Sequence, residues 1–317
     1  MDAIKRARSF SDKKLKKIRQ ALERVVPENE IVVTCGSYAR REASSNSDID
    51  YFVITEQNPA ENSKLEQSNF PWFENVSSIV SEIIGTDPAE DGAFKKIETL
   101  DGMLKNIGGQ DDRNSKITRR ILFLLEGEHL ANSHGLNRAR RMILKRYISN
   151  DMTDHQLALF LLNDIIRYYR TMAVDYEFKT SEGDNPKPWG IRNIKLVFSR
   201  KLLYASGLFS VALTADRTSD KKVELLEDLF KMPVIDRMEE ICGRAKLEDV
   251  LDSYNRFLDK FEDPVARDRL KDISKDERDD SLFRELKNEG HHFTRELLKL
   301  FESTFDSTHP IRKAVIF

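Results

Sequence analysis

The sequence predicts an α+β protein, with a small strand-containing domain at the N-terminus and an all-α domain behind it. Two short apolar segments, 31–35 and 48–54, are rich in β-branched and aromatic residues and indicate buried strands. From about Ile117 onward, apolar residues recur at helical spacing almost everywhere. Because the strands precede the helical region instead of alternating with it, we expect two domains, 1–125 and 126–317.

Composition excludes several classes of protein. The 317 residues are 39% hydrophobic and 33% charged, with a formal net charge of -2, so no overall field draws the chain to nucleic acid or to an anionic membrane. Cys35 and Cys242 have neither disulfide nor zinc spacing. No apolar run approaches the roughly 20 residues of a membrane span, and the N-terminus lacks the apolar core of a signal peptide. We expect a cytoplasmic protein without membrane association.

In the N-terminal domain, apolar spacing predicts a helix over 15–25, capped by Ser11 or Asp12. A further helix is expected over 72–84 and a third strand over 93–100. The helical region is expected to contain the following segments: a core helix at 121–125, a basic amphipathic helix at 136–148, a long two-faced helix at 156–179, a helix at 191–208 and charged helices over 221–305.

Two aspartates in the second predicted strand carry the main chemical signal. Strand side chains alternate between faces, so Asp48 and Asp50 point the same way, about 6–7 Å apart. Two carboxylates this close repel each other unless a cation lies between them. Mg²⁺ is the natural partner, with Mn²⁺ as an alternative, because it binds carboxylate oxygens and completes its shell with water and substrate phosphates.

The end of the first predicted strand supplies a phosphate site. Gly36 and Ser37 lie between this strand and a short helix. Backbone N–H groups at a helix N-terminus attract anions, glycine permits close approach of a phosphate, and the Ser37 hydroxyl adds a donor. Gly-Ser alone is common, but its fixed spacing from the two aspartates, between apolar strands, is much less so.

Gly36-Ser37, ten residues and then Asp48-Ile49-Asp50 match the GSx10DxD signature of the DNA polymerase β-like nucleotidyltransferases. The sequence resembles most closely the bacterial minimal-nucleotidyltransferase branch. The resemblance implies a small mixed sheet with helices, Mg²⁺ on the two aspartates and triphosphate contacts from Gly36 and Ser37. Later segments look like those of larger bacterial members, in which a helical domain follows the transferase core.

The family usually has a third carboxylate on a later strand, which completes the metal site or acts as a general base. Glu98 is the candidate, because it lies on a plausible strand about 50 residues after Asp50, and Asp101 and Asp112 are rivals. A solvated glutamate at a strand end is an equally good interpretation. Without a third carboxylate, nucleotide binding alone becomes the better hypothesis.

Basic side chains provide further candidates for binding the nucleotide. Arg40 lies on the short helix after Ser37. Four more residues are candidates for clamping the triphosphate from the helical domain: Arg167, Arg170, Lys195 and Arg200. The alternative for this group is a solvated or salt-bridged helix face.

Together these features predict a nucleotidyltransferase that moves an NMP group, with AMP as the expected group, from Mg-NTP to an acceptor hydroxyl and releases pyrophosphate. The acceptor is open among a protein side chain, an RNA end, a small molecule and a second nucleotide. Alternatives are a catalytically silent nucleotide-binding regulator, with a helical domain that contacts a partner protein, and a structural interaction protein without a nucleotide site.

Overall fold

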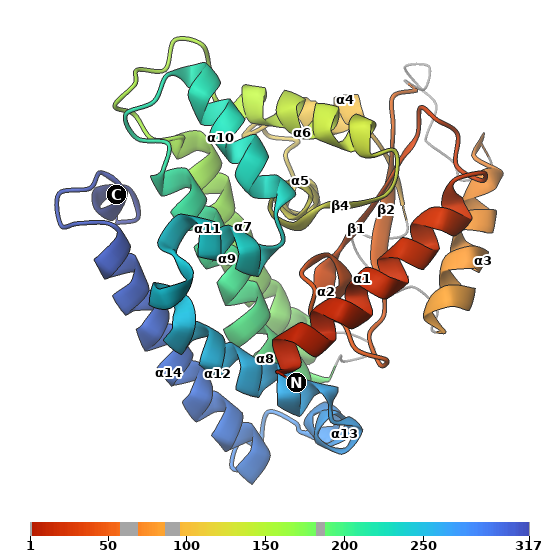
Figure 1. The fold of residues 1–317 in the computed structure, drawn as a ribbon, viewed down its shortest axis with the longest axis vertical. Helices are drawn as coiled ribbons and strands as arrows, with labels where there is room; N and C mark the ends of the chain where they lie inside the picture. Colours follow the sequence, from red (N-terminus) through yellow and green to blue (C-terminus); the bar gives the residue numbers. More distant parts are fainter. Residues whose placement is uncertain (1, 58–68, 86–95, 182–187, 317) are drawn as a thin grey trace. The chain divides into compact units, whose positions relative to one another are not determined.

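The computed structural model describes residues 2–57, 69–85, 96–181 and 188–316. The chain divides into two compact units, each described here by itself (Figure 1). The sheet unit comprises 7–152 and 219–233. The helical unit comprises 1–6, 153–218 and 234–317.

A four-stranded mixed sheet forms the centre of the sheet unit (Figure 1). Its order is β3-β2-β1-β4, where β1 pairs antiparallel with β2 and β4, and β2 pairs parallel with β3. The strands are β1 (Ile31–Cys35), β2 (Asp50–Thr55), β3 (Ile97–Thr99) and β4 (Glu128–Ala131). The predicted α+β class, with a small mixed sheet followed by a mostly helical remainder, is confirmed.

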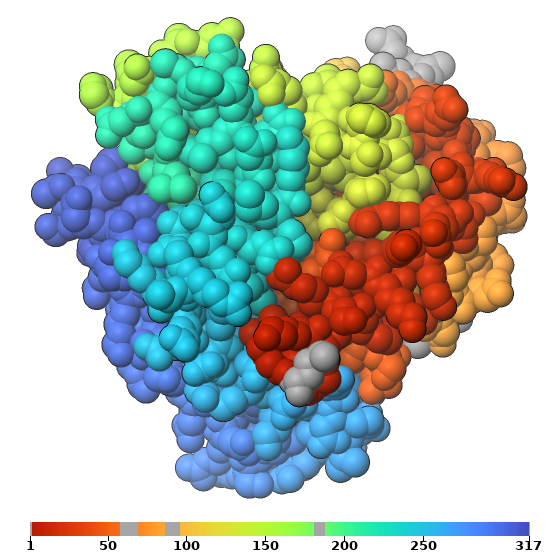
Figure 2. Space-filling model, viewed as in Figure 1, coloured from red at the N-terminus to blue at the C-terminus, as the bar shows by residue number. Residues whose placement is uncertain are grey.

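One face of the sheet packs against two amphipathic helices. Val32, Tyr51 and Val53 share an apolar core with side chains of α1 (Ala3–Leu22) and α3 (Trp72–Ile84). The other side of α1 lies at the surface of the molecule, where α1 is red in Figure 2. Burial of this apolar helix stripe, at roughly 25 cal/mol per Å², holds the helices on the sheet.

Three helices cover the opposite face or lie behind it. The helices α5 (Asn114–Glu126) and α6 (Ser133–Tyr147) contact β1, and α10 (Ser219–Lys231) packs on both of them. An ion pair of 2.7 Å between Arg141 and Glu227 joins α6 to α10. The sheet unit also contains two short helices, α2 (Gly36–Ala39) and α4 (Leu100–Leu104).

The helical unit is built around aromatic side chains. Phe198 stacks on Phe257 at a centroid distance of 4.5 Å and contacts Phe293 at 5.1 Å. A π-helical turn, η2 (Leu196–Arg200), lies between α8 and α9. The other elements are α7 (Leu159–Ser181), α8 (Trp189–Lys195), α9 (Lys201–Ala212), α11 (Val234–Cys242), α12 (Arg244–Glu262), α13 (Pro264–Asp272), α14 (Ser281–Thr304) and α15 (Ile311–Ala314).

The structure differs from the sequence-based expectation at several element boundaries. The helix expected to start near Ser11 begins at Ala3, and the Ser11 hydroxyl donates to the Ala7 carbonyl inside it (2.7 Å) instead of capping it. The second strand begins at Asp50, two residues later than expected. The third predicted strand is present over 97–99, and positions 93–95 lie outside the described residues.

The strand β4 was not expected from the sequence, and it lies in the part of the sheet unit beyond the predicted domain boundary. Its sequence, Glu-His-Leu-Ala, has little β-branched character, and the strand forms because its backbone pairs with β1. The predicted division between residues 125 and 126 falls within α5, just before its last residue Glu126, whereas the compact sheet unit continues to Met152.

Candidate active site

The adjoining ends of β1 and β2 bring Gly36 against Asp50. Cys35, the last residue of β1, is paired with Asp50, the first residue of β2. Gly36 then turns the chain with φ +77, in the left-handed region that favours glycine. A Cβ at this position would lie 2.8 Å from Asp50 Oδ2. A side chain here would be strained by the backbone conformation and would have to displace the Asp50 carboxylate.

The residues between and beside the aspartates fix which way they point. Ile49, Tyr51 and Val53 all lie in the apolar core beneath α1 and α3. Asp48 and Asp50 alternate with these core residues along the chain, so we expect both carboxylates on the opposite side. Asp48 is exposed and Asp50 is half-buried. The carboxylate of Asp48 has no hydrogen bond or ion pair among the residues that the structure describes.

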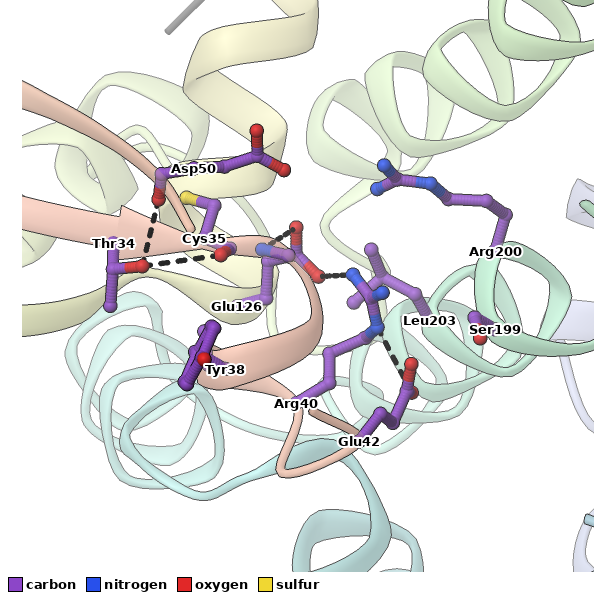
Figure 3. A network of polar contacts seen from close by, with 12 residues as sticks. Thr34, Cys35, Tyr38, Arg40, Glu42, Asp50, Glu126, Ser199, Arg200 and Leu203 are labelled. Carbon is purple, nitrogen blue, oxygen red and sulfur yellow. Dashed lines mark hydrogen bonds and ion pairs between the residues drawn. The ribbon is translucent and has the colours of Figure 1, made fainter. Parts of the chain in front are cut away.

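Hydrogen bonds hold the Asp50 backbone while its carboxylate lies next to Gly36. Thr34 donates its hydroxyl to the Asp50 carbonyl at 2.7 Å, as Figure 3 shows.

Tyr38, one residue beyond Ser37, is buried in the apolar core. Burial first, and then the charge of Asp48, raises the pKa of the Tyr38 phenol to about 12. The phenol is neutral at physiological pH, and its hydroxyl donates to the Ser47 carbonyl at 3.4 Å.

A buried carboxylate from α5 binds the turn. Glu126 Oε1 accepts a hydrogen bond from the Gly36 N–H (2.9 Å), and its Oε2 accepts from Arg40 Nη1 (2.5 Å). Arg40 Nε donates in turn to Glu42 (2.9 Å), so the guanidinium lies between two carboxylates (Figure 3). The side chains of Arg40 and Glu126 are 6% and 0% exposed. A phosphate on Arg40 would have to compete with these contacts, so its predicted role remains a prediction.

Sequence reasoning missed Glu126. The only local signal is an acidic residue at the end of the apolar run ILFLLE, before Gly127. A glutamate at a helix end is normally solvated, so the pattern gave no reason to place this one beneath a turn 90 residues earlier in the chain.

Ser37 is the member of the turn that remains accessible. Its side chain is half-buried, and within the described ranges its hydroxyl has no hydrogen-bond partner. Its carbonyl accepts from the Glu42 N–H at 2.8 Å, which fixes the chain after the turn. An available hydroxyl on the residue that follows the contact between Gly36 and Asp50 is suited to binding a metal-bound phosphate.

The structure does not bring Glu98 to the aspartates. Glu98 pairs with Ile54 in the parallel register of β2 and β3, and Ile54 lies four residues beyond Asp50. At about 3.3 Å per residue, that offset is about 13 Å. Glu98 instead forms an ion pair with Arg119 of α5. The catalytic role predicted for Glu98 therefore has no support from its position.

The other proposed third carboxylates are also held elsewhere or exposed. Asp112 is buried and binds Arg120 through both carboxylate oxygens, at 3.0 and 2.7 Å. Asp101 forms an exposed pair with Lys105 at 2.5 Å. Among the described residues, no group of three or more His, Cys, Asp or Glu side chains is arranged to hold a metal.

The four basic candidates of the helical unit lie on two helical segments of that unit. Arg167 and Arg170 are exposed on α7. Lys195 ends α8, and Arg200 ends the π-helical turn and donates to the Tyr168 hydroxyl at 3.3 Å. Single π turns often occur at functional sites. The triphosphate contact predicted for these four basic residues remains a prediction.

Comparison with known families identifies the segment that contains the turn and the aspartates. Residues 15–104 match the family model of the nucleotidyltransferase domain. This part of the chain is therefore similar to a nucleotidyltransferase domain. The matched segment includes Gly36, Ser37, Asp48 and Asp50, and it ends before Glu126. No curated protein matches the chain. Within the described residues, no helix has the length and apolar character needed to cross a membrane.

Proposed function

We propose that this nucleotidyltransferase moves an NMP group, with AMP as the expected group, from a metal-bound NTP to an acceptor hydroxyl. One observation carries the proposal. The Gly36 turn has a left-handed backbone and lies so close to Asp50 that a Cβ would be 2.8 Å from Oδ2, and Ser37 directly follows this contact. The nucleotidyltransferase match over 15–104 supports it.

The donor set suits a hard divalent cation. Asp48 is exposed and Asp50 is half-buried, both alternate with core residues along the chain, and both offer only oxygen. Two carboxylates fit Mg²⁺, or Mn²⁺ as an alternative, because such ions keep water and substrate phosphates in the remaining positions. When bound, the cation would neutralise charge on the phosphates. Asp48 and Asp50 are the residues that would hold it.

The chain's own residues would then orient the triphosphate. The Ser37 hydroxyl donates to a phosphate oxygen, and Gly36 leaves room for it. The acceptor oxygen forms a bond to the α-phosphorus, the bond from that phosphorus to the bridging oxygen breaks, the acceptor proton is released, and pyrophosphate leaves. Protein side chains, RNA ends, small molecules and a second nucleotide all offer a suitable hydroxyl.

The test is transfer of an α-labelled nucleotide. We expect pyrophosphate release, or label on an acceptor, when the protein is incubated with Mg²⁺ and each of the four NTPs, with and without cell lysate. Asp48→Asn and Asp50→Asn should each lower the rate by about a thousandfold or more, since such transfer depends on charge neutralisation. Because Asp48 is exposed, Asp48→Asn should leave the melting temperature within about 2 °C of wild type.

The position of Glu98 favours a second candidate. With Glu98 paired to Arg119 instead of lying beside Asp50, the site resembles one that binds a nucleotide without turning it over. A regulator of this kind would be stabilised by Mg-NTP in a thermal-shift measurement and would transfer no label. A chain that shows neither stabilisation nor transfer has no nucleotide site, and both candidates would be wrong.

A further inference from the structure

The backbone N–H at the centre of the proposed phosphate site already has a partner inside the protein. Gly36 N–H donates to Glu126, at the end of α5 and outside the segment that matches the nucleotidyltransferase domain. An N–H donor can serve one acceptor well, and this acceptor is a fully buried carboxylate. The Gly36 amide is therefore part of the scaffold beneath the turn.

The network beneath the turn has matched donors and acceptors. Glu126 uses one oxygen for Gly36 and the other for Arg40, and Arg40 also reaches Glu42. The side chains of Glu126, Arg40 and Glu42 are 0%, 6% and 5% exposed. Charge-assisted hydrogen bonds that are shielded from water are strong and directional. Such a network stabilises the turn and also fixes its orientation.

The charge arrangement explains how a buried carboxylate can lie next to a phosphate site. An unpaired anion under the turn would repel a triphosphate. Arg40 lies at bonding distance from both Glu126 and Glu42 and offsets one of their two negative charges. This assigns Arg40 a different task from the direct phosphate contact that its place in the sequence suggested.

We propose that Glu126 is a positioning residue, which fixes the Gly36–Ser37 turn so that Ser37, and not the Gly36 N–H, donates to the triphosphate. This inference rests on the proposed nucleotidyl transfer. Gly36 lies so close to Asp50 that a Cβ on it would touch Oδ2. The hydrogen bond from Gly36 to Glu126 therefore also sets the distance of the turn from Asp50. The buried acid thus connects α5 to both halves of the site.

The matching substitution is Glu126→Gln, which keeps the side-chain volume. Glutamine replaces one of the two carboxylate oxygens with an NH₂ group, so a donor would face either the Gly36 N–H or the Arg40 guanidinium where an acceptor now lies. Asp112→Asn is the matched control. Asp112 is a buried acid that accepts from Arg120 through both oxygens and from the Gly108 N–H (2.9 Å), so its amide variant suffers the same kind of loss elsewhere in the sheet unit.

Mg-ATP and the other three Mg-NTPs are titrated calorimetrically into full-length wild type and both variants, well below their melting temperatures. We expect both variants to have a lower melting temperature than wild type. Only Glu126→Gln is expected to bind nucleotide at least tenfold more weakly. Hydrogen exchange should rise over residues 36–41 in Glu126→Gln alone. If Glu126→Gln does not fold, Glu126→Asp, whose shorter carboxylate cannot reach both donors, is expected to show the same weakening.

Each remaining outcome has a separate meaning. Equal nucleotide affinity in Glu126→Gln and wild type would show that Glu126 only stabilises the fold, and would overturn the inference while leaving nucleotidyl transfer intact. Tighter binding would show that the carboxylate competes with phosphate for the turn, and would also overturn it. If wild type binds none of the four nucleotides, the proposed function itself is wrong, and the positioning role is wrong with it.

Discussion

At the residue scale, the site depends on the close approach of Gly36, which has no side chain, to the Asp50 carboxylate. Gly36 has φ +77, and a Cβ at this position would lie 2.8 Å from Asp50 Oδ2. The sequence motif contains both residues but gives no reason for their dependence on each other. The reason is steric. Cys35 pairs with Asp50, so the turn that follows Cys35 lies against the Asp50 carboxylate.

We predict that Gly36→Ala abolishes nucleotide transfer and destabilises the sheet unit. The left-handed backbone alone costs a non-glycine residue about 1–2 kcal/mol, and the new Cβ must also displace Asp50. Gly85→Ala is the control, since Gly85 has φ +85 but open space around its Cβ position. Chemical denaturation and label transfer measure the two effects.

The control should show strain alone, with transfer close to wild type. Equal behaviour of Gly36→Ala and Gly85→Ala in both measurements would mean that the approach to Asp50 has no functional importance.

At the element scale, β4 is anchored by a carboxylate that joins three segments. Glu128 accepts from Arg19 of α1 at 2.6 Å and from Arg41, just after α2, at 2.9 Å. Burial acts to raise the pKa of Glu128, but a hydrogen bond from His129 and the charges of Arg41 and Arg19 outweigh it and lower the pKa to about 2. The short edge strand is thus stabilised by charge as well as by its pairing with β1.

This contact should stabilise the sheet unit in a pH-dependent way. A carboxyl with a depressed pKa stabilises the fold fully above its unfolded pKa of about 4.3, and the contribution is lost as the pH falls toward 2. The displacement corresponds to about 3 kcal/mol. We therefore expect the difference in unfolding free energy between wild type and Glu128→Gln to be constant from pH 8 to pH 5 and to shrink below that.

Denaturant titrations at several pH values test this expectation. Glu23→Gln, at an exposed position of the same unit, serves as the reference, because its difference from wild type should stay small at every pH. A wild-type advantage over Glu128→Gln that persists undiminished to pH 3 would rule out the ionised carboxylate as its source.

At the scale of the whole molecule, the two units are not consecutive in the sequence. The helix α10 lies between elements of the helical unit along the chain but packs on α5 and α6 of the sheet unit. Its apolar side includes Leu226, which is fully buried. A division at one point in the sequence cannot represent this arrangement.

We predict that Leu226→Ala loosens the sheet unit. Removing a buried leucine costs about 2–5 kcal/mol, and the loss should fall on the unit that the side chain packs into. Hydrogen exchange should increase in α5, α6 and β1. Leu247→Ala in α12, also fully buried, is the counterpart, and it should increase exchange in α11 and α14 instead. The same exchange pattern in both variants would contradict the division into these units.

The sequence by itself determined the α+β class, the strands at Ile31–Cys35 and Asp50–Thr55 within a residue or two, and the nucleotidyltransferase signature. These follow from local properties: β-branched runs, helical periodicity, and the fixed spacing of Gly36-Ser37 from the two aspartates. The common side predicted for Asp48 and Asp50 involves only neighbouring residues, and it stays a prediction because β2 begins at Asp50.

Only the tertiary structure decided what lies around that motif. Glu126 reaches Gly36 across 90 residues, Glu98 pairs with Arg119, and β4 exists only through β1. Each of these depends on packing between distant segments, where register and helix rotation select one partner among several of like charge. Local sequence carries no record of that choice, because an acidic residue at a helix end has the same pattern whether it is solvated or buried beneath a turn.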